Sequence, residues 1–162
     1  MPFRWSGRTV QTLSAAAMSA LLLTSAMKHF REPRFFAQVV PDYLCRDAPD
    51  AGQPGAAGES TPDGGGRPLA VMTREEWIAV SGLLEAGAAV VLLVPATRRP
   101  AATAVTAMFA VFLAGHVDAL RRAYGPTGSA EQRKAHTLRL PLQLPLILWA
   151  WSLRGGHARP RR

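Results

Sequence analysis

The chain has 162 residues, enough for one domain, and a formal net charge of +8 at pH 7. Such a charge is common in nucleic-acid-binding proteins. Here, however, the basic residues gather at the ends of apolar stretches and do not alternate with aromatic residues along a binding platform, which excludes nucleic acid as a partner. A single cysteine, Cys45, excludes an internal disulfide. We expect Cys45 to be a passive loop residue, with an intermolecular disulfide or a reactive thiol as the alternative.

Four apolar stretches bounded by arginine or lysine dominate the sequence. A helix needs about 20 apolar residues to cross the hydrocarbon core of a bilayer. The first stretch has no charge, the second has only Glu85, and the third is uncharged until His116 and Asp118 near its end. The predicted fold is therefore all-α: a single four-helix transmembrane bundle over residues 1–162. We expect the spans at about 9–27, 77–97, 100–120 and 138–153.

The connection between the first two spans has two parts. Pro33 suits the first turn of a short helix. An apolar side that includes Phe35 and Phe36, together with the basic Lys28, Arg31 and Arg34, predicts an interfacial helix within residues 28–41. Residues 46–68 are rich in Gly, Pro, Ala, Asp and Ser, a composition that predicts a disordered insertion in the first loop. Order resumes at Thr73, which with Glu76 forms a predicted capping box.

Four spans place both termini and the middle loop on the same side of the membrane. These segments contain eight arginines and no acidic residue, so the positive-inside rule puts both termini in the cytoplasm, in the inner membrane of a bacterial cell. The third loop is also basic and is the contrary evidence. A second interpretation treats residues 1–27 as a cleaved signal peptide, but the apolar run is longer than usual for one.

One carboxylate lies deep in a span. Glu85 follows Trp77 by eight residues, about 12 Å below the outer interface. A charge at that depth costs roughly 3 kcal/mol or more, so we expect it to face the bundle interior beside partners from the other spans. The candidate pocket residues are Glu85, Ser81, His29, His116, Arg139 and Gln143.

Within this pocket we expect Glu85 to contact Arg139, Gln143 or both, with His29 or His116 completing the cluster. The functional interpretation is an outward-opening pocket with a proton-active carboxylate, and the structural interpretation is a polar clasp that sets helix register. A metal site from His29, His116 and Glu85 is weak, since no standard ligand spacing is present, and we expect no metal. His136 lies in a basic flank and is predicted to be solvated.

The order of these motifs resembles the DoxX family of small bacterial membrane proteins, over all four spans. The resemblance rests on His29-Phe30 with Pro33, Phe36, Val40 and Pro41; Trp77 with Ser81-Gly82 and Glu85; Pro95 with Thr97-Arg98-Arg99 and Ala101; and Arg139-Leu140-Pro141-Leu142-Gln143 with Pro145, Trp149 and Ala150. It implies a four-helix membrane bundle. It also implies an association with quinone-linked sulfur oxidation or with oxidative-stress proteins. Similar proteins have a short first loop, so residues 46–68 are an insertion.

Three functions follow as expectations. The first is a membrane subunit of a quinone-linked redox or oxidative-stress system, with quinone as a loosely bound cofactor and either a redox partner protein or self-association in the bilayer. The second is a small proton-coupled exporter, because four spans and one membrane carboxylate are also found in small multidrug transporters; in those proteins the essential glutamate lies in the first span. The third is a structural or assembly subunit without chemistry.

Overall fold

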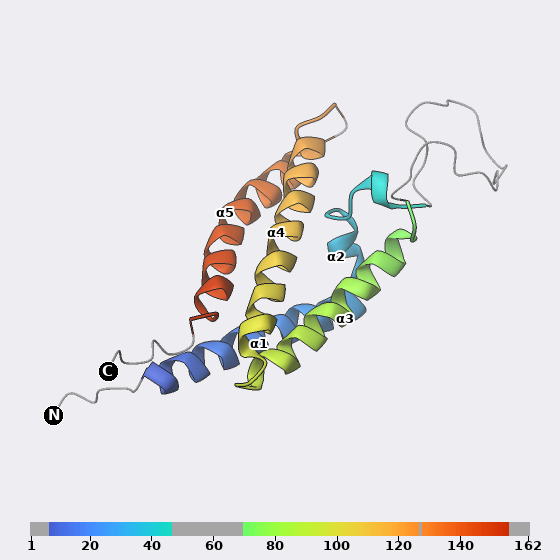
Figure 1. Ribbon diagram of the computed structural model, residues 1–162. Coiled ribbons are helices and arrows are strands. Elements are labelled where there is room, and N and C mark those ends of the chain that lie inside the picture. The colour runs from blue at the N-terminus through green and yellow to red at the C-terminus, as the bar shows by residue number, and fades with distance from the viewer. Residues whose placement is uncertain (1–6, 47–69, 127, 156–162) are drawn as a thin grey trace.

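The computed structural model describes residues 7–46, 70–126 and 128–155, and within them the fold is all-helical. Its helices are α1 (Gly7–Arg31), α2 (Pro33–Ala37), α3 (Arg74–Leu93), α4 (Arg98–Ala123) and α5 (Ala130–Ser152), with a short 3-10 helix, η1 (Asp42–Leu44), after α2 (Figure 1). The described residues form no strand; a single parallel bridge joins Cys45 to Met72.

The four long helices run alternately in opposite directions (Figure 1). We call the end that holds the start of α1, the α3–α4 turn and the end of α5 the basal end. The side chain of Gln11 donates to the Gly155 carbonyl there at 2.8 Å, and the Arg99 guanidinium donates to the Arg154 carbonyl at 3.1 Å. The opposite, distal end holds α2, η1 and the α4–α5 connection. Both ends of the described chain therefore lie together at the basal end.

Helix α1 packs chiefly against α3, and α4 packs against α5, while α3 and α4 share a smaller contact. Small residues permit the α1–α3 approach, as is usual between helices in lipid. The buried Ser19 hydroxyl donates to the Ala89 carbonyl at 2.9 Å. A Cβ added at Gly82 would lie only 2.9 Å from the Cβ of His29, so glycine is needed where α3 passes the end of α1.

The hydrophobic core lies toward the basal half of the molecule and is built from all four long helices. Its members are Ala15, Met18, Leu22, Ala89, Leu92, Ala101, Ala102, Val105, Phe109, Ala150 and Leu153. Toward the distal end, α2 and η1 lie between α3 and the upper half of α4 (Figure 1).

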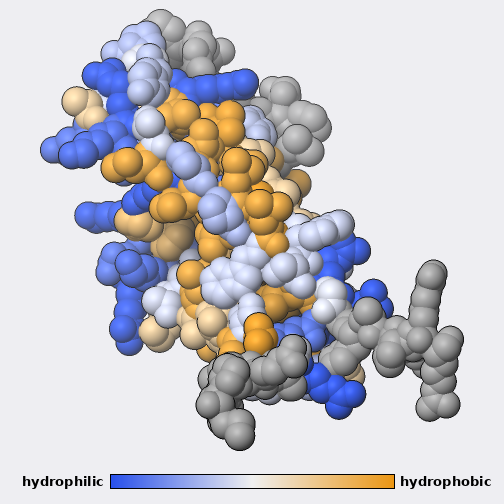
Figure 2. Space-filling model, turned by 90° about the vertical axis from the view of Figure 1, so that its left-hand side faces the viewer, coloured by the Kyte–Doolittle hydropathy of each residue, from blue (hydrophilic) through white to orange (hydrophobic). Residues whose placement is uncertain are grey.

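The outer surface is unusually apolar for a folded chain. Large hydrophobic side chains are exposed on every long helix, including Leu13, Leu83, Val90, Val111 and Leu148. Figure 2 shows hydrophobic residues covering the middle of one face, with hydrophilic residues gathered at its top and along its edges. Helices α1, α3 and α4 are long and apolar enough to cross a membrane. Together these observations indicate a membrane protein.

The predicted helices can be compared with these bounds. The three apolar spans and the short helix beginning at Pro33 are confirmed as helices, and so is the Thr73–Glu76 capping box. The fourth helix begins eight residues before its predicted start, at a second capping box between Ser129 and Gln132, and continues through both prolines. It does not reach the apolar content of the other three. The predicted disordered insertion, 46–68, lies almost wholly outside the described residues.

Candidate functional site

A half-open cavity of about 500 Å³ lies in the distal half of the molecule. Helices α1, α2, α3, α4 and α5 all contribute to its walls, together with residues 39–44. The walls are mostly apolar and aromatic, with Phe36, Trp77 and Phe109 among them. Leu84 of α3 and Val111 of α4 line the cavity and are also 60% and 69% exposed on the outer surface, so the cavity opens sideways between these two helices. Its size and lining are those of small-molecule sites.

All six residues predicted from the sequence line this cavity. Glu85 and His29 form its buried side. Glu85 is 3% exposed, and its Oε2 lies 3.8 Å from Nδ1 of His29. That nitrogen lies closer, at 2.9 Å, to the Ser25 carbonyl, which can only accept, so the Nδ1 proton points to Ser25. The His29 ring also stacks on Phe36 with ring centroids 3.5 Å apart. Glu85 Oε2 is thus buried without a hydrogen bond.

His116 and Gln143 meet on the opposite wall. His116 Nδ1 lies 2.8 Å from the Phe112 carbonyl and donates to it, and Nε2 lies 3.5 Å from Nε2 of Gln143. An amide nitrogen only donates, so the His116 Nε2 accepts and the ring is neutral. The reverse amide orientation would require protons on both ring nitrogens, and so a buried imidazolium without an anionic partner. Gln143 Oε1 is therefore left buried and without a donor.

Arg139 and Ser81 are the remaining two predicted residues. The Arg139 guanidinium lies over the ring of Phe35, 4.1 Å from its centroid, a cation–π contact. The Ser81 hydroxyl donates to the Ile78 carbonyl of its own helix at 2.8 Å, so it neither orients Glu85 nor offers its proton to a ligand.

Two expectations about these residues are wrong. Glu85 does not pair with Arg139 or Gln143: among the described residues no hydrogen bond or ion pair joins them, because the Phe35 ring contacts the guanidinium and His116 contacts the amide. Of the expected cluster, His29 does lie beside Glu85. His136 is not solvated but only 2% exposed, because the early start of α5 draws it into the helix interface. As for a metal site, the described residues contain no cluster of three His, Cys, Asp or Glu, and His29, His116 and Glu85 do not converge.

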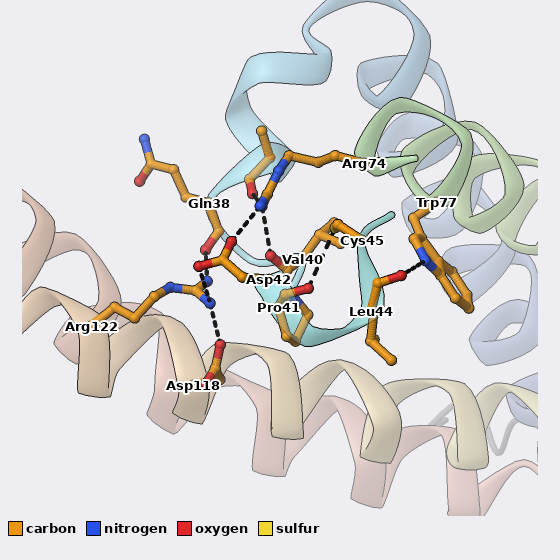
Figure 3. Close-up of polar contacts among 11 residues, drawn as sticks. Gln38, Val40, Pro41, Asp42, Leu44, Cys45, Arg74, Trp77, Asp118 and Arg122 are labelled. Atoms are coloured by element: carbon orange, nitrogen blue, oxygen red, sulfur yellow. Dashed lines mark hydrogen bonds and ion pairs between the residues drawn. The ribbon is translucent and has the colours of Figure 1, made fainter. Parts of the chain in front are cut away.

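Residues 38–46, which we call the strap, cover the distal side of the cavity. Figure 3 shows how Arg74, the first residue of α3, holds it: the guanidinium donates to the Val40 carbonyl at 2.7 Å and pairs with Asp42. The same guanidinium donates at 2.7 Å to the carbonyl of Ala37, the residue just before the strap. Trp77, one turn later, donates from its indole nitrogen to the Leu44 carbonyl at 2.8 Å. The strap thus lies across the start of α3.

Helix α4 holds the other side of the strap. Arg122 donates to the Gln38 carbonyl at 2.8 Å and pairs with Asp118, one turn earlier on α4 (Figure 3). A Cβ added at Gly115 would lie 2.7 Å from the Val39 carbonyl oxygen, so glycine lets the strap lie directly on α4. Cys45, at the end of the strap, is fully buried, which favours the passive interpretation of this thiol over an intermolecular disulfide.

Sequence reasoning missed several contributors to the site. Ser25 lies beside the Glu85 carboxyl, and its carbonyl accepts a hydrogen bond from His29. The sequence does contain a signal for this contact, because Ser25 precedes His29 by four residues and such residues are neighbours on a helix. The roles of Arg74 and Arg122 in holding the strap were missed because these arginines bind backbone carbonyls. Every residue has a carbonyl, so the sequence does not show which one an arginine will bind.

A second hollow, of about 520 Å³, lies at the basal end between the start of α4 and the end of α5. Arg99, Trp151 and Arg154 line it. It is shallower and more open than the distal cavity, and none of the predicted site residues lies in it. The distal cavity is therefore the candidate site.

Fold and site together define a small all-helical membrane protein with a laterally open cavity whose walls are apolar and whose buried polar groups come from several helices. Residues 18–154 match the family model described as a domain of unknown function, DUF8561. This match covers most of the chain, which therefore belongs to that family. Searches of the curated proteins and of the solved structures gave no match.

Proposed function

We propose that this protein is a membrane subunit of a quinone-linked redox or oxidative-stress system, as its resemblance to the DoxX family implies, and that the distal cavity binds the quinone. The single observation that supports this is the cavity's composition. Its apolar walls, open toward the surface we assign to lipid, suit an isoprenoid tail, and its few polar groups suit a polar head group.

The chain's own residues fit such a ligand. The aromatic rings of Phe36 and Trp77 offer flat surfaces for a ring-shaped head group. Arg139 makes no hydrogen bond or ion pair among the described residues, so its guanidinium is available to a ligand oxygen. Glu85 and Gln143 offer oxygens on the two facing walls. When bound, the quinone would supply the electron-carrying group, and these residues would hold and orient it.

A photoreactive azido-quinone in proteoliposomes tests the proposal. We expect covalent label on peptides that line the distal cavity. Ser81→Phe places a large ring in the cavity and should abolish most of this labelling, while Leu83→Phe, on the exposed face of the same helix, should leave it unchanged. Labelling spread evenly over the apolar surface, and insensitive to Ser81→Phe, would refute the site.

We further propose that α5 is a fourth span, which completes a four-helix transmembrane bundle in the bacterial inner membrane. It packs against α4, and it exposes Leu138, Leu142, Leu144 and Leu148 on its outer side. Among the described residues, the basal end bears Arg8, Arg98, Arg99 and Arg154 and no acidic residue, which supports a cytoplasmic location for both termini. A phosphatase fused to the C-terminus should be inactive and a green fluorescent protein bright; the reverse result would invert the topology.

A proton-coupled exporter is the second candidate, because one buried carboxyl beside an open cavity is also what proton exchange against a cation requires. Glu85→Gln would then abolish proton-driven dye efflux from everted vesicles. A purely structural role for Glu85 has less support, since a clasp would bond both of its oxygens and Oε2 is unbonded.

A further inference from the structure

The buried groups of the distal cavity differ in what they offer a ligand. Among the described residues, three buried side-chain atoms have no hydrogen-bond partner, and two of them, Glu85 Oε2 and Gln143 Oε1, belong to residues that line this cavity. Buried polar atoms are rarely left unpaired, and each unpaired one costs about 1–3 kcal/mol. The Gln143 amide oxygen can only accept, so the partner it lacks is a donor; the Glu85 carboxyl accepts when it is ionised and can also donate when it is protonated.

The histidines cannot supply these donors. The Nδ1 protons of His29 and His116 are both directed to the carbonyl four residues earlier on the same helix, Ser25 and Phe112 respectively. The His116 Nε2 accepts from Gln143, which fixes the amide with its oxygen away from the ring. Gln143 Oε1 is therefore an acceptor at any pH, because an amide oxygen does not take up a proton in this range.

Arg139 is the complementary donor at the same wall. It lies four residues before Gln143, on the same face of α5, and lines the cavity with its guanidinium over Phe35. A ligand hydroxyl placed between these two residues would accept from Arg139 and donate to Gln143. A carbonyl oxygen would accept from Arg139 but would leave Gln143 Oε1 unpaired. A second hydroxyl, toward α3, would donate to Glu85.

We infer that the cavity selects a dihydroxy head group, so that, resting on the proposed function, it binds the reduced quinol in preference to the oxidised quinone. The two forms have nearly the same ring and tail, and they differ in whether the ring oxygens carry protons. The apolar walls therefore bind both alike, and the discrimination falls on Glu85 and Gln143. A site that is built to hydrogen-bond a hydroxyl rejects the analogue without it, because the protein acceptor is left buried and unpaired.

The test compares decyl-benzoquinol with decyl-benzoquinone by equilibrium binding to the full chain in lipid nanodiscs, without oxygen, with empty nanodiscs subtracted. We expect the quinol to bind at least about tenfold more tightly, the factor that about one net hydrogen bond provides. Gln143→Met removes the fixed acceptor and should bring quinol affinity closer to that of the quinone. The matched control, Leu142→Met, changes the neighbouring exposed residue and should alter neither affinity. Glu85→Gln, which preserves the shape of the side chain, should also reduce the preference for the quinol over the quinone.

Equal binding of the two forms, or tighter binding of the quinone, would overturn the inference and leave the proposed function standing; ordered water would then be the partner of both oxygens. A quinol preference that survives Gln143→Met and Glu85→Gln would also overturn it. Binding of neither form would refute the proposed function itself, and the inference with it.

Discussion

At the scale of single residues, the polar groups of this protein divide into those that are bonded and those that are not. Ser19 donates across the α1–α3 contact to a backbone carbonyl and is fully satisfied. Glu85, on the same pair of helices, is as deeply buried and has one oxygen without a partner. The first arrangement stabilises a fold, whereas the second costs stability and persists where a function uses the group.

Glu85→Met should therefore maintain or raise the thermal midpoint in detergent while it weakens ligand binding, because the apolar side chain removes the carboxyl oxygen that is buried without a partner and fills a similar volume. The matched control is Ser19→Ala, which removes a made bond and should lower stability by about 0.6–1.7 kcal/mol, the range for hydrogen bonds between membrane helices. Unfolding curves of the two variants provide the comparison. A large loss of stability in Glu85→Met would favour the structural clasp.

The sequence was a good guide to which residues line the site and a poor guide to how they pair. Helical spacing and depth placed His29, Glu85, His116 and Gln143 near one another, because those quantities depend on periodicity alone. Their partners depend on competition within the cavity. The Phe35 ring makes a cation–π contact with Arg139, and both histidines donate their Nδ1 hydrogen bonds to the carbonyls one turn earlier on their own helices. Such a competition is decided by distances of a few tenths of an ångström between elements, which a single sequence does not contain.

At the scale of elements, the strap shows how a loop whose only regular structure is the short 3-10 helix η1 is held over a cavity. Its carbonyls at Gln38 and Val40 accept from arginines of α4 and α3 respectively, and the glycine at position 115 lets its backbone lie on α4. The exposed ion pairs around Asp42 add little by themselves. The hydrogen bonds to carbonyls matter more, because those groups would otherwise be unpaired next to an apolar cavity.

Arg74→Met should loosen the strap, because it removes two carbonyl bonds at once. Cys45 is a native reporter, as the single cysteine of the chain and fully buried in the strap. We expect its labelling by a maleimide to be slow in the natural protein and at least about tenfold faster in Arg74→Met. Arg34→Met, which alters an exposed arginine of α2, is the control and should leave the rate unchanged. Equal rates in all three proteins would mean that other contacts fix the strap.

The bounds of the helices were predicted more closely at their apolar centres than at their polar ends. The centres of α1, α3 and α4 were predicted correctly because long runs with almost no charge have few alternatives in lipid. The second span was expected to reach residue 97, but α3 ends at Leu93. The start of α5 was missed since Lys134 and Arg139 interrupt its apolar pattern, although Ser129 and Gln132 form the capping box that marks it. Burial of His136 followed from that early start.

At the scale of the whole molecule, the long first connection leaves and re-enters the fold at one place. The amide of Arg46 donates to the Met72 carbonyl at 2.9 Å, and Cys45 forms a bridge with the same residue. The residues between them, 47–69, lie outside the described structure. Residues on the two sides of this connection are thus in contact, as they would be if a short loop joined them.

Replacing residues 48–68 with a few glycines should accordingly leave expression and the thermal midpoint unchanged, because the ends to be joined already lie in contact. Loop closure changes by only about 0.6 kcal/mol for each doubling of loop length. Extending the deletion through Met72 breaks the closing bond and should lower the midpoint clearly. A loss of stability from the shorter deletion would show that part of the connection packs against the helices.

The lateral opening of the cavity between Leu84 and Val111 has a consequence for how affinity should be understood. A ligand that reaches the site from within the bilayer diffuses in two dimensions and is concentrated there by its own partitioning. Its occupancy then follows the mole ratio of ligand to lipid rather than its aqueous concentration. Lipid acyl chains compete for the same opening at molar concentration. A ligand therefore has to bind more tightly than they do through the interactions of its head group alone. A site of modest intrinsic strength can therefore be filled in a membrane and be empty in dilute detergent.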